Sequence, residues 1–251
     1  ETVNLEMSPL LSPHSDDIIM NAELFKRVKY VYDHQKDMKL DKEQKKLLEE
    51  NYKRFVRSGA NLDAANQEKL RKLNEELSML EITFGQNLLA ETNAFRLVID
   101  NKADLAGLPD NLIATAAETA KEAGLDGQWM FTLHNPSVMP FLQYADNREL
   151  RERMFKAYIN RGCNGNANDN KAVILRTMEL RIQRAKLLGF KTPAAQILST
   201  KMAGDPQTVD SFLAGIMAPA MARAKEEVAD MQAVMNEDIK AGLLPEGSTI
   251  Q

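Results

Sequence analysis

Residues 63–90 read DAANQEKLRKLNEELSMLEITFGQNLLA, and the apolar side chains in this stretch recur at alternating spacings of three and four. The recurring residues are Leu70, Leu73, Leu77, Leu80 and Phe84. This spacing places them on one face of an α-helix, as in a coiled coil. Asp63 can cap the first turn, and a helix of about 28 residues would be about 42 Å long. The stretch therefore predicts a long helix.

Helical periodicity continues on both sides of this stretch and covers about two thirds of the chain. Upstream, helices are predicted to begin after Asn21 and Asp41, the second ending at Gly59, and to form an antiparallel hairpin. Downstream, helices are predicted over residues 147–160, 170–188, 192–202 and 205–240. Pro219 lies inside the last of these, so a kink or a break is expected there.

Two short segments interrupt the helical pattern. Residues 94–100 (AFRLVID) and 128–133 (QWMFTL) are rich in branched or aromatic residues and are bounded by turn residues, which predicts strands. Pro109 suits the first turn of a helix between them that ends at Gly124, so the two strands can pair. The predicted fold is mainly α, with helical hairpins or a bundle and a small two-stranded β insertion. We expect residues 1–251 to form one helical region, with a possible subdivision into residues 1–135 and 136–251.

The composition excludes several classes of partner. The chain has 251 residues, of which 44% are hydrophobic and 27% charged, and 32 basic residues are interleaved with 36 acidic ones. This balance offers no strongly basic surface, so nucleic acid is not an expected partner. Apolar runs stay well below the length of about 20 residues that spans a bilayer, so no membrane partner is expected. The single cysteine, Cys163, excludes an internal disulfide and a thiolate metal cluster.

Histidines and carboxylates form no recognisable catalytic pattern. The H-E-x-x-H pattern of zinc peptidases is absent, and the histidines are His14, His34 and His134. His14 stands near Asp16 and Asp17, which could form a weak metal site, but a solvated turn in which Ser15 or Asp16 caps a short helix is the favoured interpretation. His34 and His134 are interpreted as structural.

Two other patterns have a functional and a structural interpretation. Asn164, Asn166 and Asn168 have the spacing of a calcium loop, but Asp169 and Leu175 occupy the positions that require Gly and Glu, so a polar turn is favoured. Four methionines at helical spacing could form a peptide-binding face, although core filling is favoured; they are Met217, Met221, Met231 and Met235. No catalytic, cofactor-binding or metal-binding residue is assigned in this chain.

Several long strings in collinear order resemble one family of enzymes. They are ELSMLEITFGQNLLAETNAFRLVI (76–99), LAGLPDNLI (105–113), NRELRERMFKAYINRG (147–162) and LRIQRAKLLGFKTPAAQILSTKMAGDPQTVDSFL (180–213). They resemble the zinc oligopeptidases of the thimet oligopeptidase and neurolysin type, and within that family the bacterial peptidyl-dipeptidases. The resemblance extends over essentially the whole chain.

This resemblance implies a largely helical enzyme with a deep channel, whose N-terminal half forms one wall and whose C-terminal half binds zinc. The chain would be the N-terminal, non-catalytic wall of a peptidase that releases dipeptides from the C-terminus of short peptides by means of zinc-activated water. Its partners would be short peptides and the missing C-terminal catalytic half, which would supply every zinc ligand. Glu1 and Gln251 have the character of cut ends, so a fragment is expected. The cytoplasm is the expected compartment, with the periplasm as the alternative.

Two other functions stay open at this stage. One is an endopeptidase of the oligopeptidase A type, which belongs to the same family. The other is a stand-alone helical interaction module, in which the stripe from Leu70 to Phe84 binds a partner helix.

Overall fold

The computed structural model describes residues 2–250, and helices make up 71% of the protein. The described residues contain one sheet of two antiparallel strands, so the predicted mainly α class with a small β insertion is confirmed. The chain separates into two compact units, residues 1–188 and 189–251, which we describe in turn. The division after residue 135 stays a prediction.

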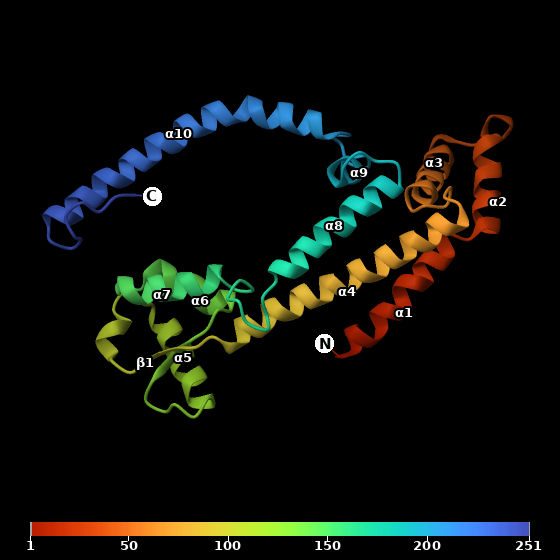
Figure 1. The fold of residues 1–251 in the computed structure, drawn as a ribbon. Coiled ribbons are helices and arrows are strands. Elements are labelled where there is room, and N and C mark those ends of the chain that lie inside the picture. The colour runs from red at the N-terminus through yellow and green to blue at the C-terminus, as the bar shows by residue number, and fades with distance from the viewer. Residues whose placement is uncertain (1, 251) are drawn as a thin grey trace. The chain divides into compact units, whose positions relative to one another are not determined.

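The first unit is organised around α4 (Ala64–Ala94), a helix of 31 residues that corresponds to the predicted long helix. Asp63 caps it by accepting a hydrogen bond of 2.8 Å from the Asn66 backbone amide, as expected. Two helices, α1 (Thr2–Ile19) and α8 (Lys171–Leu187), pack along α4 on opposite sides (Figure 1). The three helices form a layer whose middle member is α4.

The predicted helical hairpin is formed by α2 (Ala22–Asp33) and α3 (Lys42–Arg57), joined through the short 3₁₀ turn η1 (Gln35–Asp37). Asn21 caps α2, and Asp41 forms a reciprocal capping box with Gln44 at the start of α3. The ring of Phe25 stacks against Phe55 with ring centroids 5.9 Å apart. This aromatic contact, packed against the buried Ile19, holds the hairpin to the end of α1.

The β insertion and the helices that follow it share one core. Strands β1 (Leu97–Ile99) and β2 (Trp129–Phe131) pair with Leu97 opposite Phe131. Around them lie η2 (Lys102–Leu105), α5 (Asp110–Glu122), α6 (Asn135–Tyr144) and α7 (Arg148–Ile159). Side chains with no more than 4% exposure fill the centre; they include Leu97, Ile99, Leu105, Phe131, Leu133, Val138, Phe141 and Met154.

Two helices are absent from the sequence-based prediction, namely α1 and α6. Both contain prolines that favour a turn interpretation, such as Pro13 in α1 and Pro136 in α6. Pro136 falls in the first turn of α6, where its missing amide hydrogen costs nothing, and His134 is the N-cap residue. The expected solvated turn, in which Ser15 or Asp16 caps a short helix, is wrong, because both residues lie inside α1.

The second unit contains α9 (Pro193–Leu198) and α10 (Pro206–Lys240), capped by Thr192 and Asp205 as predicted. α10 runs through Pro219 without interruption and curves along its length (Figure 1), so the alternative of a break is wrong. A helix can distribute the distortion from one proline over neighbouring turns. After α10 the chain folds back, and the Gln232 side chain accepts a hydrogen bond of 2.9 Å from the Ile250 amide.

Truncation of the core around the sheet is expected to destabilise the first unit strongly. Phe141 is fully buried, with its ring centroid 4.7 Å from that of Phe131. Phe141→Ala should lower the free energy of unfolding by about 3–5 kcal/mol, measured by urea denaturation followed by circular dichroism. The matched control is Phe155→Ala on α7, whose side chain is half exposed and should cost less than about 1 kcal/mol. Equal losses in the two variants would contradict this account of the core.

Candidate functional site

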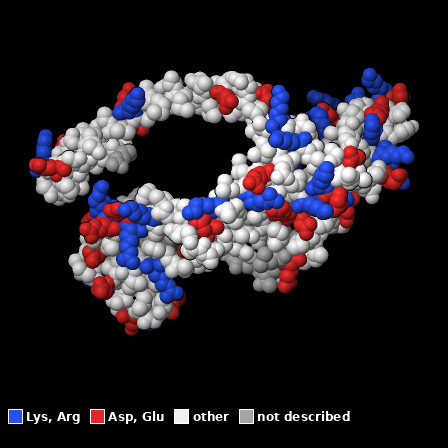
Figure 2. Space-filling model, in the orientation of Figure 1, with Lys and Arg blue, Asp and Glu red and all other residues white. Residues whose placement is uncertain are grey.

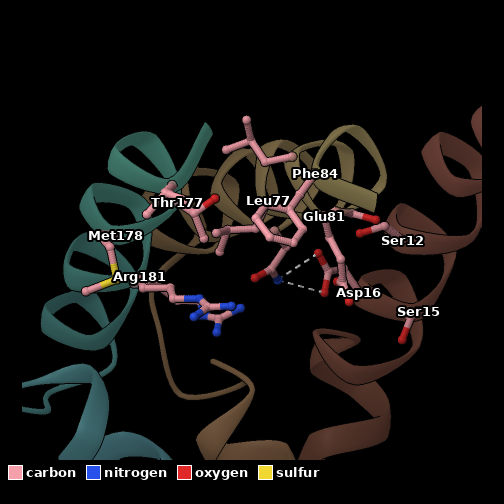
Figure 3. A pocket seen from close by; sticks show the side chains of 14 residues that line it. Ser12, Ser15, Asp16, Leu77, Glu81, Phe84, Thr177, Met178 and Arg181 are labelled. Atoms are coloured by element: carbon pink, nitrogen blue, oxygen red, sulfur yellow. Dashed lines mark hydrogen bonds between the residues drawn. The ribbon is translucent and has the colours of Figure 1, made fainter. Parts of the chain in front are cut away.

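The three-helix layer of the first unit frames a groove of about 660 Å³ (Figure 3). α1, α4 and α8 all contribute side chains to it. The apolar lining consists of Leu77, Leu80, Phe84, Ile174 and Met178, and the charged lining of Asp16, Glu81, Arg181 and Arg184. The groove therefore combines an apolar surface with charges of both signs.

The apolar surface comes from two helices whose sequences place one face toward the groove. On α4, Leu77, Leu80 and Phe84 follow spacings of three and four, so they lie along one side of the helix. On α8, Ile174 and Met178 are separated by one turn and line the other wall. Phe84 and Met178 remain exposed to solvent, so a large apolar area in the groove is uncovered in this structure.

On the α1 side the acidic residues hold two helices together. The Asn74 side chain on α4 donates hydrogen bonds of 3.1 and 3.2 Å to the Asp16 carboxylate. Burial raises the pKa of Asp16, and the hydrogen bond from Asn74 opposes that rise. Arg71 on α4 forms an ion pair of 2.6 Å with Asp17. These carboxylates therefore anchor α1 to α4, and His14 lies exposed on the same helix.

The α8 side of the groove carries two neighbouring guanidinium groups. Arg181 and Arg184 lie three residues apart on α8, and Arg181 extends toward the middle of the groove in Figure 3. Within residues 2–250 neither forms an ion pair with a carboxylate, and the buried Nε of Arg184 has no hydrogen-bond acceptor. Burial and the adjacent Arg181 charge lower the pKa of Arg184. This part of the groove can therefore accept an anionic group.

A second polar cluster lies at the C-terminal end of α4, around the buried carboxylate of Glu91. It accepts hydrogen bonds from the Gly162 amide at 2.8 Å and from the Asn164 and Asn166 side chains at 2.5 Å each. Burial alone would raise the pKa of Glu91, but the three donors outweigh it and lower the pKa. Two of the three asparagines whose spacing resembles a calcium loop, Asn164 and Asn166, thus donate hydrogen bonds to Glu91. This supports the interpretation of the loop as a polar turn.

The histidines do not assemble a zinc site in the described part of the chain. His14 lies on α1, His134 precedes α6, and His34 stacks on Tyr30 with ring centroids 4.2 Å apart. No group of three or more His, Cys, Asp or Glu side chains within residues 2–250 is placed to hold a metal ion. The residues present therefore do not fit the zinc that the family resemblance implies, and we derive no catalytic step from them. Cys163 is exposed in the loop after α7.

The methionines of α10 do not fill a core in the second unit. Met217, Met221 and Met231 are exposed, and no residue of α10 is buried within the unit. The core-filling interpretation is therefore wrong for these three methionines, whereas Met235 is partly buried. Residues 211–222 of this helix carry no charge, whereas basic and acidic side chains are interspersed over the face of the first unit in Figure 2.

Sequence comparisons relate this architecture to known peptidases. Residues 141–246 match the model of Peptidase family M3. The chain is 39% identical over 232 residues, 92% of its length, to the dipeptidyl carboxypeptidase of Escherichia coli strain K12. The chain is related to the M3 peptidases. It is also 33% identical to oligopeptidase A of the same organism over 229 residues, or 90% of its length.

The M3-related chain spans about a third of the length of the relatives that it matches. It covers 34% of the dipeptidyl carboxypeptidase and 34% of the oligopeptidase A. It is 30% identical to saccharolysin of Saccharomyces cerevisiae, over 80% of its own length and 27% of that protein. The resemblance inferred from the four sequence strings is confirmed.

No helix within residues 2–250 has the combination of length and apolar character that crossing a membrane requires.

The Glu91 cluster leads to a stability prediction. Glu91→Gln replaces one acceptor oxygen by an NH₂ group, which would face either the Asn166 NH₂ group or both the Gly162 amide and the Asn164 NH₂ group. The free energy of unfolding should therefore fall by about 1–3 kcal/mol near neutral pH. Because the pKa of Glu91 is lowered in the fold, its stabilising effect is complete above the ordinary value of 4.5 and is lost as pH falls through the folded pKa. Urea denaturation at several pH values measures both effects.

The matched control is Glu122→Gln, at an exposed glutamate for which the described structure shows no ion pair. This substitution should change the stability by less than about 0.5 kcal/mol at every pH. A gap between wild type and Glu91→Gln that stays constant on acidification would contradict the role assigned to the Glu91 carboxylate.

Proposed function

We propose that this chain is a channel-wall part of a longer zinc metallopeptidase that releases dipeptides from the C-terminus of short peptides. The observation that carries the proposal is the 39% identity to a dipeptidyl carboxypeptidase over 92% of the chain. Residues 141–246 also match the M3 family model, so the similarity does not rest on a single relative. Activity, substrate and catalytic partner are assigned here to the longer protein.

In this proposal the zinc ion and the residues that activate water belong to polypeptide outside residues 1–251. The separate positions of the three histidines in the fold support this assignment. The contribution of the chain is a rigid helical wall, for which the layer of α1, α4 and α8 and the insertion core provide the framework. Such a wall can restrict which peptides reach the zinc ion without touching the reacting bond.

Endopeptidase activity of the oligopeptidase A type is the nearest alternative, and it is supported by 33% identity over 90% of the chain. A stand-alone interaction module is the alternative from another class. It is favoured by the open groove, because Leu77, Leu80 and Phe84 of the predicted stripe line it. Size-exclusion chromatography with light scattering tests the module, because a stable monomer that buries the stripe from Leu70 to Phe84 would count against it.

The first test determines the sequence of the native polypeptide, and the second identifies the products that it releases from peptides. Peptide mapping of the protein from its source should reveal sequence beyond Gln251 that contains H-E-x-x-H. The longer protein should convert short peptides to C-terminal dipeptides, identified by mass spectrometry, and a chelator should abolish the reaction. Internal cleavage products would instead support the oligopeptidase A alternative.

The isolated chain of residues 1–251 provides the complementary measurement. We expect it to show no hydrolysis of the same peptides when zinc is added, because its described residues assemble no zinc site. Turnover by the purified chain, sensitive to chelators, would overturn its assignment as a non-catalytic wall. A native polypeptide that ends near Gln251 would leave the interaction module as the remaining function.

A further inference from the structure

The groove on the first unit has the geometry of a seat for one additional helix. α1 and α8 both pack on α4, and the groove lies on one face of the layer that the three helices form (Figure 3). A helix placed in the groove would contact all three and complete a four-helix arrangement. The uncovered side chains that it would meet include Phe84 and Met178.

Both walls of the groove have the periodicity that a helix requires. Leu77, Leu80 and Phe84 on α4 are spaced by three and four, and Ile174, Met178 and Arg181 on α8 are spaced by four and three. Rows of side chains with these spacings form the ridges and grooves into which a neighbouring helix packs. An extended peptide, whose side chains alternate with a period of two, would match this surface poorly.

The charges of the groove define the chemistry of this helix. Arg181 and Arg184 lie beside each other, and within residues 2–250 no carboxylate pairs with either. Guanidinium groups bind carboxylates through paired, charge-assisted hydrogen bonds, which would also provide an acceptor for the buried Nε of Arg184. Two carboxylates also line the groove: Asp16, which already accepts hydrogen bonds from Asn74, and Glu81 on α4. The groove therefore requires an apolar ridge and a carboxylate near the Arg181 end.

We propose that this groove is occupied by an amphipathic helix of the same polypeptide from outside residues 1–251, with an Asp or Glu that pairs with Arg181 and Arg184. The proposal rests on the proposed function, in which the polypeptide is longer than this chain. Its second support is that the chain spans only 34% of the relatives that it matches across nearly its whole length. The groove is then an internal interface that joins the wall to the remainder of the enzyme.

Photo-cross-linking in the full-length polypeptide tests the occupant. A photoreactive phenylalanine analogue replaces Met178 in the groove, and in a matched control it replaces Lys186, which is exposed on α8 outside the groove. We expect the Met178 position to cross-link to a single peptide from outside residues 1–251. Mass spectrometry should show that this peptide has apolar residues at spacings of three and four and an acidic residue next to them. The Lys186 position should not yield this product.

Three results would overturn the proposal: no cross-link from the Met178 position, a cross-link to a second copy of the chain, or a cross-link to another protein. Each is distinguishable from failure of the proposed function, which is judged by the downstream sequence and the released products. A full-length enzyme that releases dipeptides but shows no such cross-link would retain the function and refute the docked helix.

Charge reversal tests the ionic part of the proposal. Arg181→Glu combined with Arg184→Glu should reduce the Met178 cross-link yield about tenfold or more, because two carboxylates would then face the acidic residue of the helix. Lys186→Glu provides a charge reversal on the same helix and should leave the yield unchanged. Replacement of the identified acidic residue by Arg should restore the cross-link in the double variant. An unchanged yield in the double variant, or no restoration, would contradict the proposed pairing.

Discussion

The buried carboxylate of Glu91 holds the loop between α7 and α8 against the C-terminal end of α4. It lies buried near the end of α4 and accepts hydrogen bonds from Gly162, Asn164 and Asn166 in the loop between α7 and α8. In the same loop the buried Asn170 side chain donates to the carbonyl of Phe84 on α4 at 3.1 Å. A buried charge is tolerated only when such donors surround it, so this loop has to close over the end of α4.

The position of the loop then sets the path of α8 along α4. Arg176 on α8 forms a bidentate ion pair with Glu76 on α4, with N–O distances of 2.5 and 2.9 Å, and this exposed pair is consistent with the register of the two helices. α1 occupies the other flank through Arg71 and Asp17. The groove follows from this arrangement, because α1 and α8 cover the flanks of α4 and leave the face that carries Leu77, Leu80 and Phe84 open. Its lining combines exposed apolar side chains with two arginines that form no ion pair within residues 2–250, which are the features on which the proposed docked helix rests.

The sequence alone predicted most elements whose causes are local. Asn21, Asp41 and Asp63 each accept a hydrogen bond from a backbone amide three residues later, an interaction visible in the sequence as a cap before an amphipathic run. The two strands were likewise predicted from branched and aromatic residues between turns. The residue pattern does not predict α1 and α6, because their prolines are typical of turns. Pro136 lies in the first turn of α6, where proline is tolerated, whereas Pro13 lies inside α1. The relation to the M3 peptidases was also recognisable from sequence strings.

The amino-acid sequence by itself therefore determined the helical class, the caps, the β insertion and the family relation, because each depends on neighbouring residues or on extended similarity. Only the tertiary structure decided the partner of Glu91, the anchoring role of Asp16 and the lining of the groove. Asp16 meets Asn74 across 58 positions of the chain, and Glu91 meets Asn166 across 75. Pairings at such separations depend on how whole helices pack, which no local pattern of residue types encodes.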